Sequence, residues 1–138
     1  MAINLWLDTN ILLDLYDDTR LAFQPTSIYI RNSIESKATL YVNSDTISTM
    51  FYILRSRKKV TFHEALTAVE QTIQMCTLVE INTTDSLLAV ALCKDDALPF
   101  CDYEDTLQYV CAQKVEATMI VTNDKGFISP DIPIQKTC

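Results

Sequence analysis

Apolar residues along this chain fall into two patterns that alternate from one end to the other. Five short runs have the length and composition of buried strands, at residues 3–7, 38–43, 77–81, 117–122 and, in the tail, 131–135. Six longer segments carry apolar residues three and four positions apart, as helices do, at residues 9–16, 26–36, 46–57, 62–75, 85–95 and 104–115. Strands that alternate with helices predict an α/β fold: a three-layer sandwich with a central, mostly parallel sheet of four to five strands.

Local signals at the helix starts support this assignment. Pro25 precedes the second predicted helix, and Ser44 is the expected cap of the third. Thr61 and Glu64 have the spacing of a capping box at the start of the fourth. The apolar positions of this fourth helix recur at helical spacing and predict its buried face: Phe62, Ala65, Leu66, Val69 and Ile73.

Length and composition narrow the class of protein. With 138 residues, 49% of them hydrophobic, we expect a single domain that spans residues 1–138 and buries a sizeable core. No apolar run reaches the roughly 18 residues of a membrane span, and the N-terminus lacks the pattern of a signal peptide, so we expect a soluble, cytoplasmic protein. The one glycine, Gly126, excludes the glycine-rich loops that bind nucleotide phosphates.

The cysteine and histidine content argues against a zinc site. None of the five cysteines forms a C-x-x-C pair, and the one histidine, His63, is far from all of them in the sequence. We therefore expect small buried thiols in a reducing compartment, at Cys76, Cys93 and Cys111. His63, at a polar helix start, is expected at the surface.

The net charge of −7 is unfavourable for general binding of nucleic acids, which needs a basic surface. A local basic stretch can still guide an RNA backbone, and one is formed by Arg55, Arg57, Lys58 and Lys59. The alternative is a solvated helix end, where the helix dipole favours cations. Several aspartates of helices and loops are expected to be solvated: Asp14, Asp17, Asp95 and Asp96.

Four aspartates stand out by their positions relative to the predicted strands and helices. Asp8 and Asp124 follow predicted strands, and Asp102 and Asp105 lie at the start of a predicted helix. Sites in parallel α/β sheets lie at the carboxyl ends of the strands, so the fold can bring these carboxylates together. Such a cluster would bind Mg²⁺ or Mn²⁺, ions that activate water at a scissile phosphate. Alternatively, each aspartate is an ordinary cap or turn residue.

Three segments carry a resemblance to a known family: "LDTNILLD" at 7–14, "DYEDTLQYVCAQ" at 102–113 and "IVTNDKGF" at 120–127. In this order and spacing they resemble the PIN domain over essentially the whole chain. The resemblance implies a parallel sheet between helices and an acidic pocket that binds Mg²⁺ or Mn²⁺. Many PIN domains are endoribonucleases, including toxins of VapBC-type toxin–antitoxin pairs. The resemblance therefore also implies RNA as the substrate, an antitoxin protein as a partner and a homodimer as the assembly.

The family's motifs imply roles for individual residues. The metal-binding and catalytic acids would be Asp8, Asp105 and Asp124, and Asp102 matches an additional metal-binding acid. Supporting polar residues, which would orient the carboxylates through hydrogen bonds, are Asn10, Ser44 and Thr122.

One position departs from the family's pattern. The second acid of the family usually lies in the helix after the second strand, and counting from Ser44 places it at Met50. The missing carboxylate leaves two functions open. The first is a ribonuclease that hydrolyses RNA phosphodiester bonds through a metal-activated water. The second is a catalytically degenerate PIN domain that serves as an RNA-binding or protein-interaction module. Apolar residues of the same helix are candidates for a dimer contact: Phe51, Tyr52 and Ile53.

Overall fold

A computed structural model describes residues 2–57 and 59–138, so Lys58 of the predicted basic stretch lies outside the described residues. Within these ranges the strands are β1 (Asn4–Leu7), β2 (Thr39–Asn43), β3 (Thr77–Val79), β4 (Met119–Val121) and β5 (Ile134–Gln135). The helices are α1 (Thr9–Tyr16), α2 (Phe23–Glu35), α3 (Ser44–Ser56), α4 (Phe62–Met75), α5 (Thr83–Lys94) and α6 (Tyr103–Lys114). Every predicted strand and helix is present, with small shifts at the ends.

The strands form one sheet in the order β3-β2-β1-β4-β5, and all four neighbouring pairs are parallel. β1 is central, with Leu5 opposite Leu40 of β2 and Met119 of β4. This confirms the predicted α/β fold and the fifth strand in the tail. Because the strands are parallel, their carboxyl ends lie along one edge of the sheet. Asp8 directly follows β1 at this edge.

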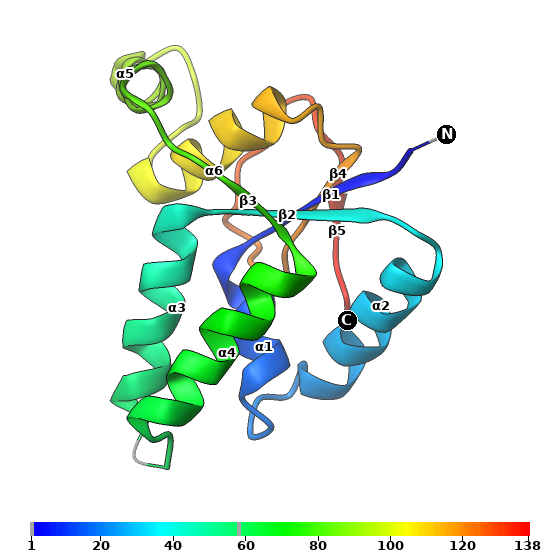
Figure 1. The fold of residues 1–138 in the computed structure, drawn as a ribbon. Coiled ribbons are helices and arrows are strands. Elements are labelled where there is room, and N and C mark those ends of the chain that lie inside the picture. The colour runs from blue at the N-terminus through cyan, green and yellow to red at the C-terminus, as the bar shows by residue number, and fades with distance from the viewer. Residues whose placement is uncertain (1, 58) are drawn as a thin grey trace.

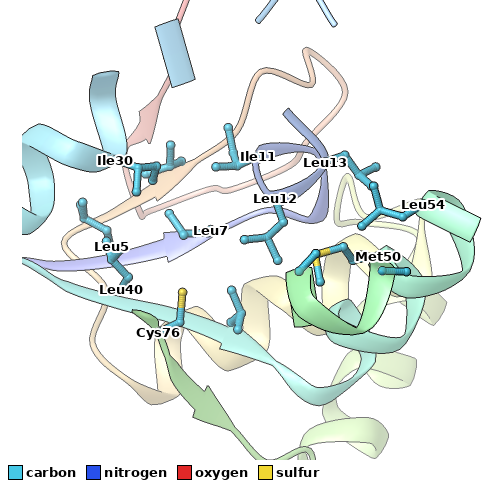
Figure 2. Close-up of a cluster of buried hydrophobic side chains, with 14 residues drawn as sticks. Leu5, Leu7, Ile11, Leu12, Leu13, Ile30, Leu40, Met50, Leu54 and Cys76 are labelled. Atoms are coloured by element: carbon cyan, nitrogen blue, oxygen red, sulfur yellow. The ribbon is translucent and has the colours of Figure 1, made fainter. Parts of the chain in front are cut away.

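The larger core lies between the sheet and helices α1 to α4 (Figure 1). Side chains alternate along β1, so Leu5 and Leu7 point to this side of the sheet and Trp6 points to the other. Leu5 and Leu7 pack there with Leu12 and Met50, as Figure 2 shows. This packing fixes the direction of α1 directly after Asp8.

A second core lies on the opposite face of the sheet, under α6. Trp6 and Ile120 of the sheet pack there with Tyr109 of α6. α5 packs against α6 rather than against the sheet, through contacts that include Ala89 and Leu107. No helix in the described ranges has the length and apolar character needed to cross a membrane.

Two helix starts differ from the prediction. α2 begins at Phe23, so Pro25 lies in its first turn rather than before it. Proline is tolerated there because the first N–H groups of a helix have no partner within the helix. Asn43 rather than Ser44 caps α3, and its side chain accepts a hydrogen bond from the Thr46 N–H at 2.8 Å.

The capping box of α4 is confirmed, but of the apolar face expected to be buried only Ala65 is fully buried and Val69 half-buried. The Thr61 hydroxyl accepts a hydrogen bond from the Glu64 N–H, and the Glu64 carboxylate accepts one from the Thr61 N–H. The buried residues of the helix are small: Ala65, Ala68 and Thr72. Larger apolar side chains are exposed instead, by 51%, 41% and 46% for Phe62, Leu66 and Ile73. Small side chains on the inner face let α4 approach α3 and the sheet closely.

The thiols follow the expectation in part. Cys76 and Cys111 are buried and Cys93 is half-buried, while the other two cysteines are exposed. Burial raises the pKa of Cys76 to about 12 and that of Cys111 to about 11, so both thiols remain protonated at neutral pH. His63 is exposed, as predicted.

Candidate active site

Asp8 lies where β1 meets α1, and its carboxylate is buried, with 3% of the residue exposed. Although Asp8 occupies the N-cap position of α1, its side chain makes no capping hydrogen bond. Instead, Gln108 Nε2 donates to Asp8 Oδ1 at 2.9 Å, and Thr122 Oγ1 donates to Asp8 Oδ2 at 2.7 Å. The carboxylate is therefore fixed by α6 and by the residue after β4, and the interpretation of Asp8 as a helix cap does not describe its side chain.

Gln108 is a buried site residue that sequence reasoning missed. Its Oε1 accepts a hydrogen bond from Trp6 Nε1 at 3.0 Å, while its Nε2 donates to Asp8. These two bonds connect β1, α6 and the acidic residue across the sheet. A signal was available, because Gln108 lies among apolar residues three positions after Asp105. A buried glutamine needs hydrogen-bond partners, and Asp8 is one of them.

Asp105, in the first turn of α6, is electrostatically coupled to the other predicted acids. Desolvation and the negative charges of Asp8, Asp102 and Asp124 raise the pKa of Asp105 to about 7. Hydrogen bonds connect the segments that carry these acids: Gln108, three residues after Asp105, donates to Asp8, and Thr122 bonds both the Asp8 carboxylate and the Asp124 N–H. The fold therefore brings the aspartates, from three separate segments, to the same end of the sheet.

Among the described residues, no cationic side chain forms an ion pair with Asp8. Burial raises the pKa of Asp8, hydrogen bonds from Thr122 and Gln108 oppose this shift, and the charge of Asp124 adds to it. In the described ranges, the three ion pairs engage Asp14, Asp17 and Asp85, and none engages the four acids. The site is an accumulation of negative charge held by neutral donors.

Asp102 and Asp124 also have the local roles that the alternative interpretation expected. Asp102 Oδ1 caps α6 by accepting a hydrogen bond from the Asp105 N–H at 2.9 Å. Asp124 Oδ1 accepts a hydrogen bond from the Gly126 N–H at 2.8 Å in the turn after β4. In this arrangement, no three Asp, Glu, His or Cys side chains of the described residues surround a common metal position. A shared ion would require new rotamers of Asp102 or Asp124, both of which are exposed.

The three supporting residues lie at different distances from the acids. Thr122 is buried, and in addition to its bond to Asp8 it accepts a hydrogen bond from the Asp124 N–H at 3.0 Å. Asn10 and Asp124 line the same hollow. Ser44 is the exposed first residue of α3, and among the described residues no hydrogen bond joins its side chain to an acid.

The structure places the basic stretch away from the acids. α3 starts at the carboxyl edge of the sheet and has 13 residues, so its other end, where the stretch begins, lies roughly 20 Å away along the helix axis. There Arg55 Nη1 donates to the Val60 carbonyl at 3.0 Å, and Arg57 Nε lies 3.6 Å from a carboxylate oxygen of Asp17. Lys59 is exposed.

The family position counted to Met50 does not face the acids. Met50 is fully buried in the larger core, with its sulfur 3.8 Å from the Thr72 hydroxyl (Figure 2). The preceding residue, Thr49, points toward α6, where its hydroxyl donates to Glu104 Oε1 at 3.4 Å. The charge of Glu104 also contributes to the raised pKa of Asp105. At this contact α3 contributes a threonine, and the acid beside it comes from α6.

Asp14 is buried rather than solvated, which corrects the expectation from sequence. Only 3% of the residue is exposed, and its Oδ1 accepts a charged hydrogen bond from Arg20 Nε at 2.7 Å. Asp17 is half-buried near Arg57, while Asp95 and Asp96 are exposed as predicted. Arg20 lies six residues after Asp14, beyond the end of α1, so helical spacing could not reveal the pair.

Comparison with known proteins bears directly on this site. A family model of the PIN domain matches residues 4–126. The chain belongs to the PIN domain family. The matched range extends from β1 to the turn after Asp124, so it contains all four acids described above.

Individual relatives of this PIN domain match it over most of their length. Ribonuclease VapC1 of Aquifex aeolicus (strain VF5) is 32% identical over 132 residues, which cover 96% of this chain and 89% of the relative. VapBC2 of Rickettsia felis, solved bound to a promoter DNA fragment, has a TM-score of 0.71 at 14% identity, over 97% of this chain and 98% of that chain. The sarcin-ricin loop cleaving toxin VapC20 of Mycobacterium tuberculosis has a TM-score of 0.67 at 11% identity, over 84% and 86%.

Proposed function

We propose that this PIN domain is a Mg²⁺- or Mn²⁺-dependent endoribonuclease that acts as the toxin of a toxin–antitoxin pair. The observation that carries the proposal is the hydrogen-bonded network that brings the segments of Asp8, Asp105 and Asp124 together at the carboxyl edge of the sheet, where no cationic side chain of the described residues pairs with these acids. The similarity to ribonuclease VapC1 supports RNA as the substrate.

The side chains at the site suit a hard divalent cation. Carboxylate oxygens are the ligands that Mg²⁺ and Mn²⁺ prefer, and the gathered acids supply such oxygens. Asp8, Asp105 and Asp124 would hold the ion, with Asp102 beside them. Such an ion supplies water activation and stabilises negative charge at a phosphate. Its positive charge would also return the pKa of Asp105 toward the ordinary range of a carboxyl group.

The chain's own contribution is to fix the carboxylate of Asp8 before the substrate arrives. Asp8 is held at both oxygens by Gln108 and Thr122, so its orientation is set by buried neighbours. Ligands held in this way bind metal more tightly, because no rotamer has to be ordered on binding. Hydrolysis by an activated water needs no covalent nucleophile, which agrees with the absence of a Ser–His pair in a chain whose one histidine is exposed.

An antitoxin partner is supported by the likeness to VapBC2. The candidate surface is a groove of about 670 Å³ between the loop after α1 and the turn that joins α3 to α4. Apolar side chains line it together with charged ones of both signs, including Tyr16, Phe23, Asp18 and Arg57. If the protein is a toxin, its expression alone should arrest cell growth. Co-expression with the product of a short reading frame next to the gene should relieve this arrest, and Tyr16→Glu should weaken the relief.

The proposal also includes a homodimeric assembly and a location in the cytoplasm. We expect residues 1–138 to act as one domain and to form a homodimer through α3, where Tyr52 is 73% exposed and Phe51 and Ile53 are half-buried. The free cysteines support a reducing compartment, as in the cytoplasm. Sedimentation of the purified protein, compared with Tyr52→Glu, tests the dimer.

A second candidate function is a degenerate PIN domain that binds RNA or protein without cleaving. Met50, at the position counted to the family's second acid, favours it, because the site then lacks one carboxylate. Calorimetric titration separates the two functions: a protein that binds RNA but releases no heat with millimolar Mg²⁺ or Mn²⁺ is the degenerate module.

Cleavage of a labelled RNA by the purified protein tests the proposal. Mn²⁺ should support cleavage, a chelator should stop it, and Asp8→Asn should lower the rate by about 100-fold or more, as loss of a key charged group in an active site does. Asp96→Asn is the matched control, because Asp96 is an exposed loop aspartate outside the gathered acids. Equal rates for the wild type and Asp8→Asn would reject the proposal.

A further inference from the structure

We propose that Arg20 binds an RNA phosphate beside the acidic site. The inference rests on the proposed function and names the cationic residue that the site otherwise lacks. An RNA strand must bring its own negative charge to a group of carboxylates on a chain of net charge −7. A cation near the acids would reduce this repulsion, and the predicted basic stretch lies at the far end of α3.

Arg20 opens onto a hollow that is shared with the acidic site. The hollow has a volume of about 400 Å³, which is within the range of ligand pockets. Its polar walls come from the carboxylate of Asp124, the amides of Asn10 and Asn123, and the Arg20–Asp14 pair. A phosphate in this hollow would have the Arg20 guanidinium on one side and the acidic site, through Asp124, on the other.

The guanidinium is held at one end only. Arg20 Nε donates to Asp14 Oδ1 at 2.7 Å, and in the part of the chain that the structure describes no hydrogen bond is made by Nη1 or Nη2. The Arg20 side chain is 28% exposed while that of Asp14 is 4% exposed. The contact with Asp14 therefore orients the group and leaves donors for a planar anion, which arginine binds with two parallel hydrogen bonds.

Asp14 is itself fixed by a buried polar network. Its Oδ2 accepts hydrogen bonds from Thr26 Oγ1 and Asn123 Nδ2, both at 3.3 Å. Thr137 of the C-terminal tail contacts both donors, with 2.7 Å between its hydroxyl and either Thr26 Oγ1 or Asn123 Nδ2. Four segments, namely α1, α2, the loop after β4 and the tail, converge on the carboxylate that orients Arg20. Such a rigid support lowers the entropy lost when Arg20 binds a phosphate.

Two measurements on Arg20→Met test the inference. The first is the enzyme concentration that gives half the maximal rate in single-turnover cleavage of a labelled RNA with Mn²⁺. The second is the salt dependence of binding the same RNA, followed by fluorescence anisotropy in Ca²⁺. We expect Arg20→Met to raise the half-saturating concentration about ten-fold, with a smaller effect on the maximal rate, and to reduce the salt slope by about 1, as loss of one phosphate contact does.

Two further variants make the result specific. Arg20→Lys keeps the charge but not the planar group, so we expect an increase of about three-fold in the half-saturating concentration. Arg31→Met is the matched control, because Arg31 is an exposed arginine of α2 outside the hollow, and it should behave as the wild type does. If Arg20→Met does not fold, Arg20→Lys still decides the question.

The outcomes separate this inference from the proposed function. A melting temperature that falls in Arg20→Met, with an unchanged half-saturating concentration and salt slope, would make Arg20 a purely structural partner of Asp14 and overturn the inference. A wild type that binds RNA but does not cleave it with Mn²⁺ would contradict the proposed function, and anisotropy of Arg20→Met would still decide the role of Arg20.

Discussion

Asp8 and Asp14 are two aspartates at the two ends of the short helix α1, and both are 3% exposed. Asp14 has a charged partner, Arg20, at 2.7 Å. Asp8 has only neutral donors, Gln108 and Thr122, and lies near the like charges of Asp105 and Asp124. A buried carboxylate is costly unless it is paired. At Asp14 an arginine offsets this cost, whereas at Asp8 no ion pair of the described residues does, which is why we propose a bound cation there.

The largest effect on stability is expected at Asp14. Asp14→Asn removes the charged partner of Arg20 and perturbs the bonds from Thr26 and Asn123, so the free energy of unfolding should fall by about 2–3 kcal/mol, less than for a fully buried pair because Arg20 is partly exposed. Urea denaturation measures this. Asp96→Asn should change the free energy by no more than about 0.5 kcal/mol. An Asp14→Asn protein as stable as the wild type would show that the ion pair with Arg20 does not stabilise Asp14, and the contrast with Asp8 would then not hold.

A somewhat smaller effect is expected on metal affinity at Gln108. Gln108→Leu removes the donor to Asp8 Oδ1 and leaves the Trp6 indole N–H without its acceptor. Loss of a residue that orients a metal ligand typically lowers metal affinity by about 10–100-fold, and we expect this for Mn²⁺ in calorimetric titration. Gln113→Leu, on an exposed part of the same helix, is the control and should keep the wild-type affinity. Equal affinities in both variants would show that Asp8 needs no such support.

The smallest effect concerns the pH dependence of the metal-free protein. The pKa of Asp105 is raised to about 7, so between pH values near 4 and near 7 the folded state binds more protons than the unfolded state. Stability contributed by the protonated group is therefore lost as pH rises through this range. Asp105→Asn should remove the loss and be more stable than the wild type by about 1 kcal/mol at pH 8, allowing for partial exposure of the group.

Urea denaturation at pH 5 and pH 8 compares the wild type with Asp105→Asn, because these two pH values lie below and above the raised pKa of Asp105. The free energy of unfolding of Asp96→Asn should change with pH as that of the wild type does. A slope that persists in Asp105→Asn would assign the pH dependence to other groups. Saturating Mn²⁺ should reverse the slope in the wild type, because the ion binds the ionised carboxylates and competes with protons.

Much of the fold followed from local patterns in the sequence. The apolar strand before Asp8 and the capping box at Thr61 and Glu64 are signals that depend on neighbouring residues only. The buried face of α4 was not predictable in this way, because Leu66 and Ile73 repeat at helical spacing but lie outside. Which side of a helix is buried depends on how closely it must approach its neighbours, and here small residues occupy the inner side.

The site could be predicted as a set of acids but not as a network. The order of the aspartates along alternating strands and helices indicated four candidates, and the resemblance to the PIN domain selected Asp8, Asp105 and Asp124 among them. The apolar neighbours of Gln108 indicate a buried polar residue, but its partner Asp8 is distant in sequence, and Arg20 lies outside helical spacing from Asp14, so no local pattern identifies these contacts. The inward direction of Met50 and the contact of Thr49 with α6 also needed the structure, since one residue along a helix turns a side chain by about 100°.

The most direct test of the account is the effect of Mn²⁺ on the melting temperature of the wild type and of Asp8→Asn. We propose that the carboxylates at the sheet edge, which form no ion pair among the described residues, bind a cation. At a Mn²⁺ concentration about 100 times its Kd, the wild type should gain about 2.7 kcal/mol in stability and melt several degrees higher. Asp8→Asn should fold without metal and show little or no gain. An equal shift in both proteins, or no shift in the wild type, would contradict the account.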